Sequence, residues 1–213
     1  MKELGYSSIG VSGQKAYNGV AIMSAIPLDN IITHLEGMED LGEARYIESD
    51  VVYNKKKYRI ISVYVPNGHE IASRRFFHKL SFYSRLEARL KNLIECGHNL
   101  IVCGDFNVVS KEIDSYNPQA MHGKLLFTTD EKKCFRRILN LGLMDTFREL
   151  NPGSKTFSWW DYRKGSWQQN KGLRIDYILA SPKTVDEINS SGIISEVRGW
   201  TKPSDHAPLY ITM

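Results

Sequence analysis

Short β-rich runs recur along this sequence, and only two segments have the residue spacing of a helix. Valine, isoleucine and tyrosine, which favour strands, gather in these runs, and polar or glycine-containing segments separate them. The segment 185–197 has no clear pattern. Strands should therefore dominate the fold, with helices covering them. We predict strands over residues 19–24, 44–53, 58–65, 99–103, 156–160, 174–180 and 207–212.

The two helical segments differ in length. Apolar residues recur every three or four positions over residues 73–96, and Gly97 follows as a stop signal. A shorter helix is predicted over residues 130–141, closed by Gly142. No repeat, linker or low-complexity tract divides the 213 residues. The sequence therefore predicts a single α+β domain, residues 1–213.

Composition and charge exclude several classes of protein. Lysine and arginine outnumber aspartate and glutamate by 28 to 24, which permits a polyanionic partner without requiring one. No apolar run is long enough to cross a membrane, and the first residues lack the apolar segment of a secretory signal. Cys96, Cys103 and Cys134 form no CxxC motif, so we expect reduced thiols in a cytoplasmic protein.

Polar clusters stand where three of the predicted strands begin or end. They contain Asp105 with Asn107, Asp176, and the pair Asp205 and His206. Because side chains alternate along a strand, Asp105 and Asn107 should share one face. Carboxylates, an amide and an imidazole can bind a hard cation and activate water. Each cluster alone is more typical of a turn aspartate or a structural histidine.

Aromatic residues near the predicted strand ends could form a binding surface. Tyr64 precedes a Pro-Asn-Gly loop, where its phenol could donate to a phosphate or belong to the core. Trp159 and Trp160 are adjacent, so a strand would point one into the core and leave the other to stack on a base or sugar. Arg163 follows them. On composition alone, packing is the more common explanation for such a stretch.

Six stretches carry a resemblance to a known family. The sequence resembles the exonuclease III family of DNA-repair nucleases, within the endonuclease/exonuclease/phosphatase superfamily. The GDFN and SDHAP stretches mark the whole superfamily, whereas FSWWDYR and GLRIDY are typical of its DNA-repair branch. A phosphatase or lipid phosphodiesterase, which lacks the last two, is the disfavoured alternative. The matching stretches cover residues 13–22, 63–68, 104–107, 156–163, 172–177 and 204–208.

The resemblance implies a fold and an activity. The implied fold is a four-layer α/β/β/α sandwich, in which two packed β-sheets lie between helices. The implied activity is hydrolysis of a DNA phosphodiester 5′ to an abasic site, often with 3′-to-5′ exonuclease activity, with Mg²⁺ or Mn²⁺ as cofactor. The implied partner is double-stranded DNA with abasic sites or 3′ ends. The enzyme would be a cytoplasmic monomer, associated with the nucleoid in a bacterium.

The resemblance also implies a catalytic role for five residues, matched by position. Asp105 would activate or orient the attacking water, and Asn107 would hold that water and the phosphate. Tyr64 would contact the scissile phosphate. His206, oriented by Asp176, would bind the phosphate and stabilise the developing charge. A cation with preorganised donors is well suited to that charge.

The remaining implied roles concern metal and DNA binding. Trp159 would line a pocket for the abasic site. The implied metal ligands are Asp105, Asn107 and Asp205. The implied DNA contacts come from residues around the site: Trp159, Arg163, Arg45, Lys171 and His206.

The family pattern begins before this sequence does. Members open with a strand carrying a site asparagine, a helix, and a strand ending in Gln-Glu, whose glutamate is a principal metal ligand. Glu3 and Glu36 lie in a different context. We therefore expect the sandwich to be incomplete at its N-terminal end, with exposed apolar surface, an unpaired strand edge and fewer metal ligands. An inactive DNA-binding remnant or split-gene fragment is the alternative to an active nuclease.

Overall fold

The computed structural model describes residues 2–38 and 42–213. Five strands precede the first α-helix along the chain, and helices and strands are interspersed after them. Within the described ranges, no helix has both the length and the apolar character needed to cross a membrane. The strands are β1 (Ser8–Gly13), β2 (Gly19–Ser24), β3 (Asp29–Ile32), β4 (Tyr46–Tyr53), β5 (Lys56–Tyr64), β6 (Asn99–Asp105), β7 (Met144–Asp145), β8 (Asp176–Ala180), β9 (Ser190–Ile193) and β10 (Leu209–Thr212). The helices are α1 (Arg74–Glu95), α2 (Pro118–Met121), α3 (Thr129–Asn140), α4 (Thr146–Leu150) and α5 (Pro182–Val185).

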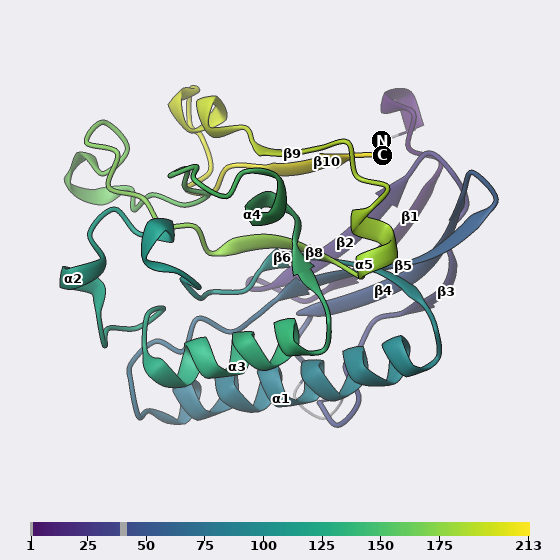
Figure 1. The fold of residues 1–213 in the computed structure, drawn as a ribbon, viewed down its shortest axis with the longest axis horizontal. Helices are drawn as coiled ribbons and strands as arrows, with labels where there is room; N and C mark the ends of the chain where they lie inside the picture. Colours follow the sequence, from purple (N-terminus) through teal and green to yellow (C-terminus); the bar gives the residue numbers. More distant parts are fainter. Residues whose placement is uncertain (1, 39–41) are drawn as a thin grey trace.

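A mixed sheet of six strands organises the molecule. Its order is β3-β4-β5-β6-β8-β7, and only the β5–β6 pair is parallel. The long helix α1 connects β5 to β6, as a parallel pair requires. Figure 1 shows α1 and α3 side by side beneath the sheet. The largest apolar core lies between these helices and the sheet.

Local sequence signals explain where the two main helices begin. The Ser73 hydroxyl accepts a hydrogen bond from the Phe76 amide at the start of α1. Thr128 and Glu131 form a reciprocal capping box at the start of α3. The prediction of two covering helices over residues 73–96 and 130–141 is therefore confirmed within a residue or two at each end.

Two hairpins contact the six-stranded sheet in addition to the helices. The β1–β2 hairpin contacts β4 and β5, and β10 of the β9–β10 hairpin contacts β8. In the described residues these hairpins are separate two-stranded sheets. The expected mixed fold of strands and covering helices is thus confirmed. The four-layer sandwich with two full sheets stays a prediction.

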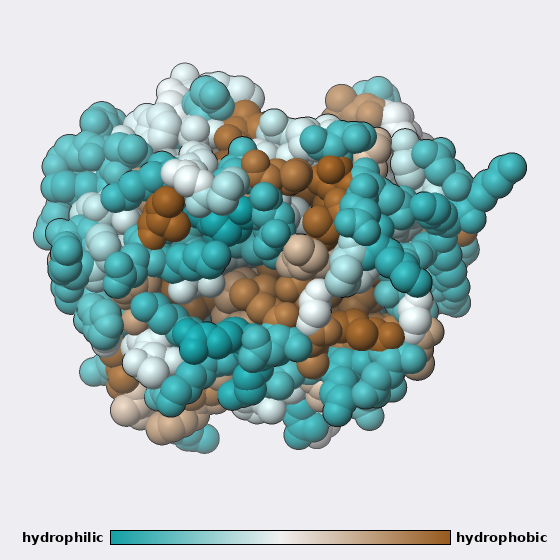
Figure 2. Space-filling view, viewed as in Figure 1, coloured by the Kyte–Doolittle hydropathy of each residue, from teal (hydrophilic) through white to brown (hydrophobic). Residues whose placement is uncertain are grey.

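An apolar groove of about 420 Å³ opens beside β10. Ile101 and Cys103 of β6 and Ile178 of β8 line it, together with Leu209 and Ile211 of β10. One of the brown patches in Figure 2 lies where Figure 1 draws β9 and β10. Apolar surface and unpaired edges on β2 and β10 are therefore present in the described part of the chain.

One strand prediction is wrong. Residues 156–160 form no strand; Trp159 makes only isolated bridges, to Leu173 and to His206. The aromatic residues of this segment are held by packing instead, because Phe157 and Trp160 are 2% and 1% exposed in a separate apolar cluster. The expectation that one tryptophan is core and the other partly open nevertheless agrees with the structure, since Trp159 is half-buried.

Candidate active site

Neighbouring strand ends bring the first site residues together. Tyr64 at the end of β5 is paired with Asp105 at the end of β6, and Asp105 is paired with Asp176 at the start of β8. Because β8 runs antiparallel to β6, its first residue lies beside the last residue of β6. The sheet register alone therefore places Tyr64, Asp105 and Asp176 in one row at one edge.

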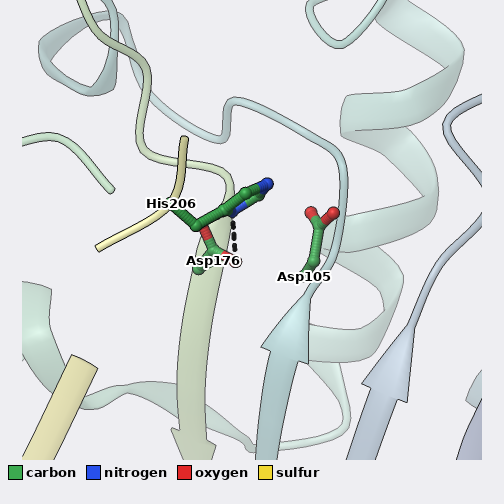
Figure 3. Close-up of side chains that lie close together, drawn as sticks. All are labelled: Asp105, Asp176 and His206. Carbon is green, nitrogen blue, oxygen red and sulfur yellow. Dashed lines mark hydrogen bonds and ion pairs between the residues drawn. The ribbon is translucent and has the colours of Figure 1, made fainter. Parts of the chain in front are cut away.

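A histidine from a loop completes this row. His206 precedes β10, and its Nδ1 lies 2.9 Å from Asp176 Oδ2 and 3.1 Å from Asp176 Oδ1. Figure 3 shows the ring against Asp176, with Asp105 facing the same space from the tip of β6. One ligand atom from each of Asp105, Asp176 and His206 lies within 4.8 Å of the others. We call these three residues the acid–histidine cluster.

Burial and charge within the cluster shift two pKa values. Burial and the neighbouring Asp176 carboxylate raise the pKa of Asp105 to about 8. Burial lowers the pKa of His206, but the hydrogen bond and charge of Asp176 outweigh burial and raise that pKa to about 9. At neutral pH the imidazole is therefore charged, which suits a group that binds a phosphate. The high pKa of Asp105 reflects its burial and its closeness to the Asp176 carboxylate, and a divalent cation between the two would stabilise Asp105 in its charged form.

Ser158 holds the Asp176 carboxylate in place. Its hydroxyl donates to Asp176 Oδ2 at 2.6 Å and accepts hydrogen bonds from the amides of Ile175 and Asp176, both at 3.1 Å. The side chain is fully buried. Sequence reasoning missed Ser158, because a serine within an aromatic stretch carries no signal of its distant partner.

A turn, rather than strand alternation, brings Asn107 to Asp105. β6 ends at Asp105, and Asn107 has a φ of +50°, which is outside the strand conformation. The Asn107 Nδ2 donates to Asp105 Oδ2 at 2.7 Å and to the Val65 carbonyl at 2.9 Å. Its Oδ1 accepts a hydrogen bond from Asn67 Nδ2 at 3.0 Å. The two side chains do lie together, but the reason given from strand period is wrong.

Asp205 lies beside the cluster with its carboxylate already engaged. Its Oδ2 accepts a hydrogen bond from Trp159 Nε1 at 2.9 Å, so it orients the indole. Among the described residues, the groups spaced to share a cation are Asp105, Asp176 and His206. Asp176 therefore joins the candidate ligands, while Asn107 and Asp205 stay predicted ligands.

Two grooves flank the acid–histidine cluster, each with residues expected to contact DNA. A groove of about 600 Å³ has Trp159 and Leu173 as apolar lining, with Arg163 and Lys171 at its rim. The Arg163 guanidinium is bound to Asp161 at 2.8 Å. The structure thus brings Trp159, Arg163 and Lys171 to one groove.

The second groove, of about 590 Å³, lies on the Tyr64 side. Arg45 lines it, with its guanidinium 4.7 Å from the centre of the Tyr64 ring. Arg75 and His78 add further cationic or titratable side chains. Arg45 is thus separate from the Trp159 groove and belongs with Tyr64.

Comparisons with known proteins find relatives that match most of the chain. The pattern of the Endonuclease/Exonuclease/phosphatase family matches residues 2–206. Exodeoxyribonuclease III of Haemophilus influenzae is 32% identical over 215 residues, covering 93% of this chain and 77% of that protein. An exodeoxyribonuclease of Bacillus subtilis is 32% identical over 200 residues, covering 92% of this chain and 74% of that protein.

Solved structures give the same answer. A 3′ phosphatase from Neisseria, NExo, bound to a product DNA hairpin, has a TM-score of 0.93 at 32% identity and covers 99% of this chain and 80% of its own. An AP endonuclease from Archaeoglobus fulgidus has a TM-score of 0.91 at 30% identity, with 99% and 80% coverage.

Fold, site and family match together define a hydrolase of the endonuclease/exonuclease/phosphatase superfamily. Within that superfamily, the chain belongs to the exonuclease III and AP endonuclease family. The resemblance carried by the sequence motifs is therefore confirmed at the level of the family.

Proposed function

We propose that this protein is a DNA-repair phosphodiesterase that cleaves duplex DNA at abasic sites and removes nucleotides from 3′ ends. The observation that carries the proposal is the acid–histidine cluster between two grooves, one aromatic and one lined by arginines. Relatives named as exodeoxyribonuclease III and AP endonuclease support DNA as the substrate. So does the solved relative bound to a DNA hairpin.

Each residue of the cluster has a role that follows from its contacts. Asp105, at the tip of β6 and facing the same space as His206, activates or orients the attacking water. His206, charged at neutral pH and held by Asp176, donates a hydrogen bond to the phosphate. Tyr64 and Asn107 contact the phosphate from the neighbouring strand end and turn.

A divalent cation fits the charge of this site. Two carboxylates with a raised pKa at Asp105 form a site that a hard cation would neutralise. We propose that Asp105 and Asp176 hold the ion, with Asn107 and Asp205 as the further ligands expected from sequence. When bound, Mg²⁺ or Mn²⁺ would neutralise charge on the scissile phosphate.

The DNA contacts belong to the same proposal. The half-buried Trp159 faces the open space of its groove and would receive the abasic sugar, with Arg163 and Lys171 near the backbone. Arg45 would contact the strand on the Tyr64 side. We further propose a cytoplasmic monomer whose natural fold is the four-layer sandwich.

The test is cleavage of a duplex that carries an abasic-site analogue. With Mg²⁺ or Mn²⁺, we expect a strand break 5′ to the analogue and digestion from a recessed 3′ end. A chelator should abolish both products, and so should His206→Asn. Hydrolysis of a phosphoinositide without cleavage of any DNA would overturn the proposal in favour of a phosphatase branch.

One observation favours a second candidate function, DNA binding without hydrolysis. Among the described residues, the groups spaced to share a cation are two carboxylates and one imidazole. Tight sites for hard cations usually have more oxygen ligands. Binding of the abasic duplex with no cleavage at any cation concentration would support this candidate.

A further inference from the structure

A lysine is completely buried beneath the site. Lys79 lies on the inner face of α1, among apolar residues such as Phe76 and Phe82, and its exposed fraction is 0%. Burial of an unpaired ammonium is very unfavourable, so its three donors need partners. They find three: a carboxylate of Glu131 and the carbonyls of Asn67 and Asn107, at 3.1 and 2.6 Å.

Glu131 is equally well satisfied. It is fully buried at the first turn of α3, where its Oε1 accepts from the Leu126 amide at 3.1 Å as well as from Lys79. Its Oε2 accepts from the Thr128 amide and hydroxyl at 3.0 and 2.7 Å. The Lys79–Glu131 ion pair thus joins α1 to α3.

The two carbonyls that Lys79 binds belong to the two asparagines beside the cluster. Asn107 has a left-handed backbone, which non-glycine residues adopt at a cost. The side chains of Asn67 and Asn107 are hydrogen-bonded to each other, and the Asn107 amide contacts Asp105. One residue, Asn107, thus connects the ammonium to the Asp105 carboxylate: its carbonyl accepts from Lys79 and its side-chain amide donates to Asp105.

We propose that Lys79 is a positioning residue that acts through Asn107. Its ammonium fixes the Asn67 and Asn107 carbonyls, which keeps the Asn107 side-chain amide hydrogen-bonded to Asp105. Stability alone does not explain the pair, because apolar residues of similar volume often stabilise a core as well as a buried ion pair does. An apolar side chain cannot hold two loop carbonyls. The inference rests on the proposed nuclease function.

The test uses two variants and a control on the same helix. Lys79→Met leaves the buried Glu131 carboxylate without its cationic partner, so this variant could fail to fold. The double variant Lys79→Met/Glu131→Gln buries no lone charge and keeps the test valid in that case. Arg89→Met is the control, because Arg89 also joins α1 to a buried glutamate, Glu48, away from the cluster. Single-turnover cleavage of the abasic duplex is measured at saturating and limiting DNA.

We expect the single-turnover rate constant of the double variant at saturating DNA to fall about 10- to 100-fold, the scale for a displaced catalytic group. The DNA concentration that gives half of the maximal rate should not change. Arg89→Met should change thermal stability without that loss of rate. A double variant that cleaves at the parent rate would overturn the inference. So would a loss of rate matched by Arg89→Met at equal stability.

A second measurement separates this inference from the proposed function. The Asn107 side-chain amide should exchange its protons slowly by NMR in the parent, and much faster in the double variant. An inactive parent would overturn the proposed nuclease function, yet this exchange would still report on positioning. Equal exchange in parent and double variant would refute the role of Lys79.

Discussion

At the scale of single residues, the His206–Asp176 pair makes the sharpest claim. Asp176 accepts a hydrogen bond from His206 Nδ1 and one from Ser158, so it links the loop before β10 to a buried hydroxyl. The raised pKa of His206 follows mainly from this carboxylate, which outweighs the effect of burial. The charge and direction of the imidazole thus depend on one neighbour.

Asp176→Asn should lower cleavage of the abasic duplex about 100-fold, the scale for removing one oriented donor from a site. Asparagine keeps the shape of the side chain but removes the charge that keeps His206 protonated. The fold should persist, as circular dichroism and thermal unfolding would verify. Equal turnover of parent and variant would refute the role assigned to Asp176.

The shifted pKa values of His206 and Asp105 predict how the stability of the fold depends on pH when no divalent cation is bound. A group with a folded-state pKa above its unfolded value stabilises the fold fully below the unfolded pKa and loses that effect as pH rises through the folded pKa. The fold raises the pKa of His206 from 6.5 to about 9 and the pKa of Asp105 from 3.8 to about 8. The two therefore act in the same direction.

In chelator, Asp105 should lower the midpoint of thermal unfolding between pH 3.8 and about 8, and His206 should lower it between pH 6.5 and about 9. The decline should be steepest where the two ranges overlap, from pH 6.5 to about 8. In Asp176→Asn this decline should be much smaller, because the Asp176 carboxylate helps to raise both pKa values. A steeper decline in the variant than in the parent would contradict this account.

At the scale of elements, the close approach of β5 and β6 sets the position of Asp105. Gly104 in β6 has a φ of +137°, and a Cβ built there would lie 1.9 Å from the Val63 carbonyl oxygen. No side chain fits without separating the two strands, one residue before Asp105. This glycine is therefore required by the strand pairing that builds the site.

Gly104→Ala should destabilise the fold by about 3 kcal/mol or more, since it adds backbone strain to overpacking. Gly153→Ala is the matched control, because no atom lies within 4 Å of a Cβ at that position. Denaturant unfolding of both variants checks the difference. Similar stabilities for the two would show that β5 and β6 can separate without cost.

The elements with strong local patterns could be predicted from sequence, and the weak ones could not. β2 and α1 are long or strongly apolar and fall almost where they were expected. The sequence does not predict β1, which has only two apolar residues, Ile9 and Val11, or α4, which has only five residues. These two depend on tertiary contacts, with β4 and with β8 respectively.

The site divides in the same way. Asp105, Asp176 and His206 could be found because each stands where an apolar run begins or ends, and sheet register then gathers them. Ser158 and Lys79 could not, because a buried polar residue is defined by partners far away in sequence. Their functional importance is therefore visible only from contacts.

At the scale of the whole molecule, the candidate site residues gather where β5 and β6 end and β8 begins. The grooves on the Trp159 and Tyr64 sides open on either side of the acid–histidine cluster. The apolar groove beside β10 is lined instead by strand interiors such as Ile101 and Ile178. A net charge of +4 adds a weak general attraction to a polyanion, so the specific contacts must come from the two site grooves.

The most direct test of the central claim is to measure DNA cleavage and DNA binding together, in the parent and in Asp105→Asn. With Mg²⁺ present, the parent should cut the abasic duplex 5′ to the lesion. The variant should bind the same duplex with similar affinity but cut it at least about 100-fold more slowly. Equal cleavage by both proteins, or binding by the parent with no cleavage at all, would contradict the claim that the acid–histidine cluster hydrolyses DNA.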